Sequence, residues 1–282
     1  MKAQDGSRWA LLLAWLAIAS SPLVAGVQAQ ETQEVPAFAK ELPMVKTGPP
    51  ILEFNGKDLA GFYTYTKKHG YADPDKVFTV HDGVIHVSGE DFGGFATGGV
   101  FRDYHLITEW KWGEKTWKPR EKATRDSGIL LHCVGPDGVA GGQWMESVEC
   151  QIIEGGCGDF ILVGGRGKPK MTVETRLGPD KQFYYQKGGE PITRDGGRFN
   201  WWGRDPNWKD VLGYRGPRDV DKPTGEWNRM EVICDGGTIT NIVNGYVVNV
   251  GTNSSHTEGK IQFQSEGAEL FFRKIEIRPL IK

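Results

Sequence analysis

The sequence lacks a long apolar run beyond residues 9–24, and it lacks an excess of charge of either sign. Its 34 Lys and Arg residues against 36 Asp and Glu residues give a formal net charge of −2. Such a balance provides no electrostatic basis for binding nucleic acid or an anionic membrane surface. The chain also shows no internal repeat and no sustained helical periodicity. These absences argue against a nucleic-acid-binding protein, a repeat protein and a helical bundle.

Cysteine is scarce, and its four positions follow no metal-binding spacing: Cys133, Cys150, Cys157 and Cys234. No histidine lies near Cys150 or Cys157. Four cysteines allow up to two disulfides in three pairings, and the sequence does not choose among them. Three of the four lie in apolar strand patterns, where cysteine often serves as a small buried hydrophobic residue.

The beginning of the chain has the pattern of a secretory signal peptide. Lys2 and Arg8 precede the apolar residues 9–24, and Val27-Gln28-Ala29 places small residues at the two positions that a signal peptidase recognises. We therefore expect residues 1–29 to be removed and the protein to be exported, either to the periplasm or to the medium. The apolar stretch is short for a spanning helix, so no membrane span is expected after cleavage. Residues 30–50 are polar and proline-bearing, as in an extended leader.

Glycine and proline are abundant, at 39 and 15 residues, which indicates frequent turns and short strands. Asp82-Gly83 and Asn244-Gly245 are favoured hairpin turns between apolar runs. Residues 104–112 alternate so that Trp110 and Trp112 share one face. We predict a single all-β domain over residues 51–282, an antiparallel β-sandwich. Residues 160–223, rich in glycine, charge and aromatic side chains, are predicted to form a long loop insertion over a sheet.

One strand-like segment, Glu149-Cys150-Gln151-Ile152-Ile153-Glu154, carries three long polar side chains in an apolar run. Alternation places Glu149 and Gln151 on one face of the strand and sends Glu154 to the other. A bulge would add one residue and return Glu154 to the face of Glu149. Carboxylates and an amide in a row suit sugar hydroxyls and acid–base chemistry. The alternative interpretation is a half-exposed strand with a polar outer face.

Eight segments, in order along the chain, together resemble the 3-keto-disaccharide hydrolase domain family, which was formerly a domain of unknown function. The segments are Phe54-Asn55-Gly56-Lys57-Asp58-Leu59, Val80-His81-Asp82-Gly83-Val84-Ile85, Asp126-Ser127-Gly128-Ile129, Glu149-Cys150-Gln151-Ile152-Ile153-Glu154, Pro223-Thr224-Gly225-Glu226-Trp227-Asn228, Val243-Asn244-Gly245, Ile261-Gln262-Phe263-Gln264 and Phe272-Arg273-Lys274-Ile275. The resemblance implies a concanavalin A-like jelly roll of two antiparallel sheets, as in legume lectins and laminarinase-type glucanases. Asp126, Glu154 and Lys274 depart from the residues usual in the family, so the sugar is not specified.

The resemblance also implies a reaction, the cleavage of a 3-keto-glycoside by elimination followed by hydration. On this basis we expect Glu149 to act as the base, and Glu154 or His132 as the acid. Gln151 is expected to bind a hydroxyl group, and Arg273 to stabilise the enolate. Asp126, Gln264 and Trp202 complete the expected substrate-binding set. An ordinary retaining glycosidase mechanism is less well supported, because Gln151 stands where the glucanases carry an aspartate between the two glutamates.

Two further interpretations stay open at this stage. No contiguous ligand motif indicates a metal, and no cofactor is expected, although convergence of His132, Glu149 and Glu154 would create a divalent metal site. A non-catalytic, lectin-like carbohydrate-binding module is the alternative function. The partner expected in either case is a small carbohydrate, and the sequence does not indicate an oligomeric state.

Overall fold

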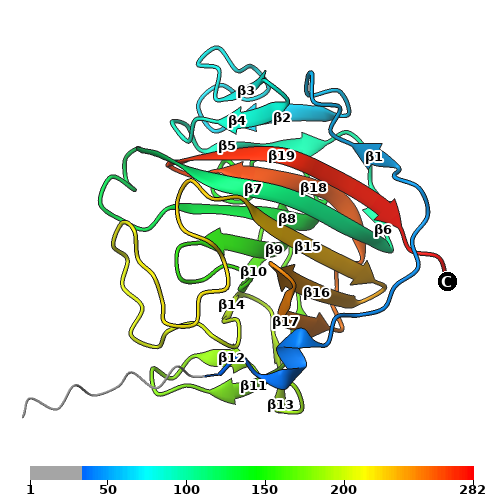
Figure 1. The fold of residues 1–282 in the computed structure, drawn as a ribbon. Helices are drawn as coiled ribbons and strands as arrows, with labels where there is room; N and C mark the ends of the chain where they lie inside the picture. Colours follow the sequence, from blue (N-terminus) through cyan, green and yellow to red (C-terminus); the bar gives the residue numbers. More distant parts are fainter. Residues whose placement is uncertain (1–33) are drawn as a thin grey trace, which may run out of the picture. The chain divides into compact units, whose positions relative to one another are not determined.

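Two antiparallel β-sheets pack face to face in the computed structural model, which describes residues 34–282 (Figure 1). The predicted all-β jelly-roll sandwich is confirmed. The only helix among these residues is a short 3₁₀ turn, η1 (Ala37–Lys40). No helix in the described part of the chain is long and apolar enough to cross a membrane. The predicted signal peptide, residues 1–29, lies outside the described residues.

The larger sheet has eleven strands. Their order is β12 (Phe183–Tyr185), β11 (Met171–Leu177), β17 (Tyr246–Thr252), β16 (Thr238–Val243), β15 (Asn228–Asp235), β7 (Tyr104–Thr116), β19 (Ala268–Pro279), β4 (Val84–Val87) and β3 (Phe78–His81), with β1 (Leu52–Glu53) paired to β19 and β13 (Glu190–Arg194) paired to β11.

The smaller sheet has eight strands. Their order is β14 (Gly197–Phe199), β10 (Phe160–Val163), β9 (Glu146–Ile153), β8 (Asp126–Val134), β18 (Glu258–Ser265), β5 (Gly93–Thr97) and β2 (Phe62–Thr66), with β6 (Phe101–Arg102) paired to β18.

Local turn chemistry sets the two predicted hairpins. Asp82 and Gly83 have φ values of 51° and 76°, and Asn244 and Gly245 have φ values of 48° and 83°. Two successive residues with positive φ form the turn whose twist matches that of the flanking strands, and Asn or Asp followed by Gly adopts it at low cost. These turns join β3 to β4 and β16 to β17.

The core lies between the sheets and is built largely from aromatic side chains. Trp110 and Trp112 of β7 point inward and are buried, as the alternation predicted. Phe263 of β18 stacks on Phe95 with ring centroids 4.8 Å apart, and Phe272 of β19 closes over them from the larger sheet at 5.5 Å from Phe263. Alternation therefore commits one face of each sheet to this core and leaves the other face for additional functions.

The segment predicted as a long loop insertion is more ordered than expected. Residues 160–199 contain the five strands β10 to β14, and the stretch between β14 and β15 is the long connection. The prediction was wrong for the first part because abundant glycine and charge obscured short alternating runs such as Met171–Leu177, which pairs with three neighbours. In Figure 1 the connection, drawn in yellow, lies beside the ends of β9 and β10.

Residues 34–50 contact the sandwich along their length. Ala39 is fully buried, and the Phe38 ring packs edge-on against Tyr185 and Trp202 at 5.6 and 6.5 Å. Thr47 forms an antiparallel bridge with Leu280 near the other end of the chain. All four cysteines are free and buried.

Candidate active site

The face of the smaller sheet that points away from the core carries a cluster of polar side chains, which we call the polar face. Strand register aligns its residues: Gly128 of β8 pairs with Gln151 of β9, and Leu130 pairs with Glu149. Gln262 of β18 pairs with Leu130, which places Gln264 beside Gly128. The polar face therefore gathers Asp126, Gly128, Glu149, Gln151 and Gln264 from three adjacent strands. Three expected substrate-binding residues thus lie next to the expected base.

Gly128 provides the space at the centre of the polar face. A Cβ atom at this position would collide with Oε1 of Glu149 and would lie 2.6 Å from Oε1 of Gln264. Only glycine lets both polar side chains lie over the strand at this point. The backbone of β8 is therefore bare where the carboxylate and the amide meet.

Three oxygen atoms on the polar face are buried without a hydrogen-bond partner among the described residues. They are Oε1 of Glu149, Oε1 of Gln264 and Oδ1 of Asp126. Buried polar atoms in native proteins almost always have partners, and each exception calls for an explanation. Three unpaired acceptors on neighbouring strands form a cluster that hydrogen-bond donors, such as sugar hydroxyl groups, would satisfy.

Burial raises the pKa values of the two carboxyl groups in this cluster. The pKa of Glu149 rises to about 8 because the side chain is desolvated and the Asp126 carboxylate lies nearby, while the Arg198 guanidinium opposes the rise. The pKa of Asp126 rises to about 6 for the same first reason, opposed by Arg120 and Arg198. Groups whose pKa values are shifted towards neutrality are suited to proton transfer.

Asp126 belongs to a second group of charges at the end of the strand. Arg120 donates to Oδ2 of Asp126 and lies 3.5 Å from Oε1 of Glu266. Burial and the neighbouring carboxylates Asp126 and Glu149 raise the pKa of Glu266 well above its usual range. One arginine thus contacts two carboxyl groups whose pKa values are both raised by burial.

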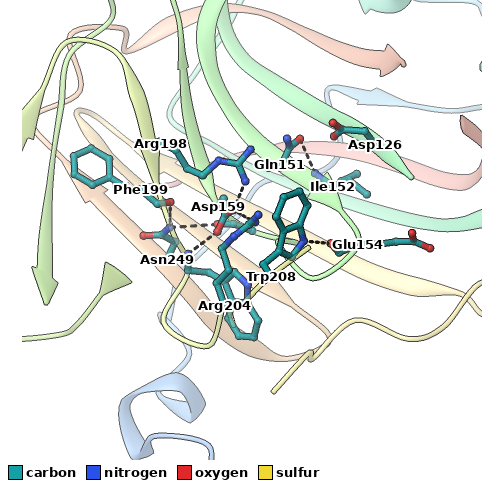
Figure 2. Close-up of polar contacts among 12 residues, drawn as sticks. Asp126, Gln151, Ile152, Glu154, Asp159, Arg198, Phe199, Arg204, Trp208 and Asn249 are labelled. Carbon is teal, nitrogen blue, oxygen red and sulfur yellow. Dashed lines mark hydrogen bonds and ion pairs between the residues drawn. The ribbon is translucent and has the colours of Figure 1, made fainter. Parts of the chain in front are cut away.

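Arg198 supplies positive charge from the other side of Glu149. The cross-strand register places Arg198 of β14, Ile161 of β10 and Glu149 of β9 in one row on the polar face. Asp159 is fully buried and holds Arg198 through an ion pair of 2.7 Å. It also pairs with Arg204 at 2.5 Å and accepts the backbone N–H of Trp201 at 2.7 Å. Figure 2 shows both arginines converging on Asp159.

Glu154 does not join Glu149, because β9 has no bulge between them. Its pairing with β8 is regular from Glu149 to Ile153. Glu154 binds the buried Arg125 through Oε1 at 2.8 Å, and its Oε2 accepts the N–H groups of Arg125 and Gly213 at 3.0 and 2.8 Å. In Figure 2 its carboxylate points away from Gln151. The structure thus places the expected acid at a structural ion pair off the polar face.

The bulge lies instead in β8, where it displaces His132. The register shifts between Leu131 and Val134, and His132 has a φ value of 51°. The imidazole is fully buried, with Nδ1 2.8 Å from the carbonyl oxygen of His256 and the ring 5.5 Å from that of Tyr104, a residue of the larger sheet. Burial lowers the pKa of His132 to about 4. His132 is therefore not placed to protonate a group bound at Glu149.

Arg273 and Trp202 also lie away from the polar face. Arg273 is an exposed residue of β19 in the larger sheet, where it pairs with Glu109 at 2.6 Å and its guanidinium lies 4.4 Å from the centroid of the Trp227 ring. Trp202 is buried in the core, and its indole N–H donates to the Val247 carbonyl oxygen at 2.9 Å. Of the expected site residues, Glu149, Gln151, Asp126 and Gln264 come together and the other four do not.

The expected alternative of a metal held by His132, Glu149 and Glu154 has no geometric basis, because these side chains diverge. No group of three or more metal-ligating side chains converges elsewhere in residues 34–282. Sequence reasoning missed Arg198, Arg120 and Glu266. Arg198 lay in the segment read as a loop, and only cross-strand register brings it level with Glu149.

Comparison with known proteins places this geometry in context. Residues 50–278 match the family model of the 3-keto-alpha-glucoside-1,2-lyase-like domain. No curated protein sequence matches the chain. A Parabacteroides distasonis protein, provisionally described as a glycosyl hydrolase, is 20% identical, with a TM-score of 0.46 over 83% of this chain and 100% of that one.

Two other solved structures are less similar in sequence. A Bacillus subtilis protein of unknown function with a galectin-like fold is 12% identical, with a TM-score of 0.46 over 85% of this chain and 100% of that one. The Bacillus licheniformis beta-glucanase is 11% identical, with a TM-score of 0.43 over 83% of this chain and 99% of that one. These likenesses concern the fold alone.

Proposed function

Because the chain belongs to the family of 3-keto-alpha-glucoside-1,2-lyase-like domains, we propose that it cleaves the glycosidic bond of 3-keto-glycosides by elimination. A carbonyl group at C3 acidifies the hydrogen on C2, so one base can begin the reaction. In the first step the C2–H bond breaks, a C1=C2 double bond forms, and the bond from C1 to the aglycone oxygen breaks. Water then adds across the double bond, with its oxygen bonding to C1 and a proton returning to C2, so the sum of the two steps is hydrolysis.

We assign the base to Glu149. Its Oε1 lies unpaired over the bare backbone at Gly128, where the ring of a bound sugar would meet it. A carboxylate with a pKa of about 8 is a stronger base than an ordinary glutamate once it has lost its proton. The unpaired buried oxygen of Glu149, grouped with two other unpaired acceptors on the neighbouring strands β8 and β18, is the observation that carries this proposal.

The neighbouring charges supply the other two requirements of an elimination. Negative charge develops on the C3 oxygen, and the Arg198 guanidinium, held in place by the buried Asp159, is the nearest cation in the row of Glu149. The leaving oxygen needs a proton, and we assign its source to the Asp126–Glu266 pair under Arg120, where burial raises the pKa values of both carboxyl groups. In this scheme the amides of Gln151 and Gln264 orient the sugar hydroxyl groups.

We further propose that the protein acts outside the cytoplasm. The support is the sequence of residues 1–29, where a basic start, an apolar stretch and small residues precede the proposed cleavage after Ala29. Edman sequencing of the protein recovered from the periplasm or medium of the expressing cells would begin at Gln30. Recovery of the full-length chain from the cytoplasm alone would contradict export.

The test of the reaction is product analysis by mass spectrometry and NMR. The purified protein is incubated with a 3-keto-disaccharide and, separately, with the unoxidised parent sugar. We expect cleavage of the keto sugar alone, and a loss of about 10²–10⁴-fold in rate for Glu149→Gln. Glu258→Gln, which changes an exposed glutamate of β18, is the matched control and should keep the wild-type rate.

Two outcomes would contradict the proposal. Undiminished cleavage by Glu149→Gln would remove Glu149 from the reaction. Cleavage of neither sugar, with binding of the keto sugar intact, would instead favour a lectin-like module in which the unpaired acceptors only bind hydroxyl groups.

A further inference from the structure

A pocket with a volume of about 480 Å³ lies on the outer face of the larger sheet. Its walls come from segments far apart in the sequence: the turn after β3, strands β4, β7 and β19, and the residue before β15. The outer face of one sheet and the polar face of the other are separated by the whole thickness of the sandwich. The pocket is therefore distinct from the site around Glu149.

Strand register builds the floor of this pocket from a row of side chains. His86 of β4 pairs with Phe271 of β19, which pairs with Lys111 of β7, and Trp227 precedes the Asn228 that pairs with Trp110. The row runs across four neighbouring strands, or about 14 Å at the usual spacing between strands. The outward face of an antiparallel sheet is normally polar, so aromatic rings gathered there require a reason.

The charges around the pocket leave one cation without a partner. Arg273 is paired with Glu109, and His86 with Glu269 at 2.9 Å. The Lys111 ammonium lies 5.1 Å from the centroid of the Trp227 ring and 5.3 Å from that of Phe271. Within the described residues no carboxylate lies within ion-pair distance of it. The pocket thus presents an ammonium group without an ion-pair partner between two aromatic rings, and the Asp82 carboxylate also lines the pocket.

We propose that this pocket binds an acidic oligosaccharide at a site separate from the catalytic face. Aromatic rings pack against the apolar C–H faces of pyranose rings, while a carboxylate or sulfate group on the sugar would pair with Lys111. The imidazole of His81 adds a hydrogen-bonding group at the rim, whereas His86 is paired with Glu269 and stacked on the Phe271 ring at 4.9 Å. A neutral sugar would leave the ammonium unpaired, so the charge favours the acidic ligand. The site does not depend on the proposed elimination.

The test is calorimetric titration of the Glu149→Gln protein, in which the catalytic face is inactivated. The probes are a galacturonic acid trimer, a sulfated oligosaccharide of equal length and neutral maltotriose. We expect one or both acidic probes to bind at least about tenfold more tightly than maltotriose. Lys111→Met keeps the apolar stem of the side chain and removes its charge, and it should weaken the acidic probe by about tenfold.

Controls separate a built site from general surface charge. Lys115→Met changes an exposed lysine of the same strand outside the pocket and should leave affinity unchanged. Trp227→Ala, which removes one of the two aromatic rings, should abolish binding, and the melting temperature is recorded for each variant. Failure of both acidic probes to bind, or binding that Lys111→Met leaves unchanged, would overturn the proposal. Tighter binding of maltotriose, lost only in Trp227→Ala, would overturn the assignment of an acidic ligand.

Catalysis provides a further control. With Glu149 unchanged, the Lys111→Met variant should cleave the keto sugar at the wild-type rate, because Lys111 lies on the other sheet.

Discussion

At the scale of single residues, the candidate site depends on a glycine, Gly128, which has no side chain. Gly128 contributes no Cβ, and Glu149 and Gln264 occupy the space that a Cβ would fill. Burying a carboxyl group beside an amide and a second carboxyl costs stability unless a proton or a ligand compensates. The raised pKa of Glu149 expresses this cost, and the same property makes the group a base near neutral pH.

The pKa of Glu149 predicts the pH dependence of the reaction. A base must be deprotonated, so kcat/KM should rise with pH, about tenfold per unit below pH 7, towards a midpoint of about 8, and a fall at higher pH would mark loss of the proton that the Asp126–Glu266 pair supplies. Initial rates with the keto sugar between pH 5.5 and 9 would measure this curve, with the stability of the enzyme checked at each pH. A rate that falls with the same midpoint would show that Glu149 acts as the acid instead.

At the scale of elements, one bulge and one connection decide which polar residues reach the site. The bulge in β8 turns His132 towards the core and brings Cys133 to the side of Leu130 and Met145. Past the end of β9, Glu154 anchors the connection between β14 and β15: its Oε2 accepts the Gly213 N–H, and the Trp208 indole donates to its carbonyl oxygen at 2.8 Å. Glu154 thus fixes a neighbouring segment rather than the substrate.

This anchoring role predicts how Glu154→Gln differs from Glu149→Gln. Removing the charge leaves the buried Arg125 without its counter-ion, so the free energy of unfolding should fall by about 3 kcal/mol. Urea denaturation followed by tryptophan fluorescence would measure this loss, and limited proteolysis would detect loosening around residues 203–214. The folded variant should still cleave the keto sugar. A stable variant without activity would return Glu154 to the catalytic group.

At the scale of the whole molecule, buried carboxyl groups set the stability profile. The pKa values of Asp126, Asp219 and Glu149 are raised to about 6, 7 and 8, chiefly by burial. These three groups therefore hold more protons in the folded protein than in the unfolded chain between roughly pH 4.5 and 8, and the lowered pKa of His132 offsets only part of this below about pH 6.5. Over that interval each group contributes stability that is present at the acid end and is lost as the pH rises.

The melting temperature should accordingly decrease as the pH increases from 5 to 8. Glu149→Gln lacks the contribution of one of these groups, so its melting temperature should decrease less. The corresponding pH-dependent loss of unfolding free energy should be smaller than in the wild type by on the order of 1–3 kcal/mol. Differential scanning calorimetry of both proteins across this range would measure it. Parallel curves for the two proteins would mean that Glu149 has the same pKa folded and unfolded.

The sequence predicts what is local and misses what depends on distant pairing. Alternation around Trp110 and the turn at Asn244-Gly245 each carry their structure in adjacent residues, and both predictions were confirmed. His132 was expected beside Glu149, but the bulge in β8, which no local signal marks, turns it away. The proximity of Arg198 to Glu149 was missed because it arises from the register of β14 on β10 and of β10 on β9. Glu149 and Gln151, which lie on one strand, were therefore easier to predict from the sequence than Arg198, which another strand contributes.

The position of β19 has a consequence for how the chain is made. This strand is the last along the sequence, yet it lies inside the larger sheet between β7 and β4, and residues near it pair with Thr47 and Leu52. During synthesis the two halves of that sheet cannot join until the C-terminal strand has left the ribosome. The larger sheet is therefore completed only once β19 has been synthesised.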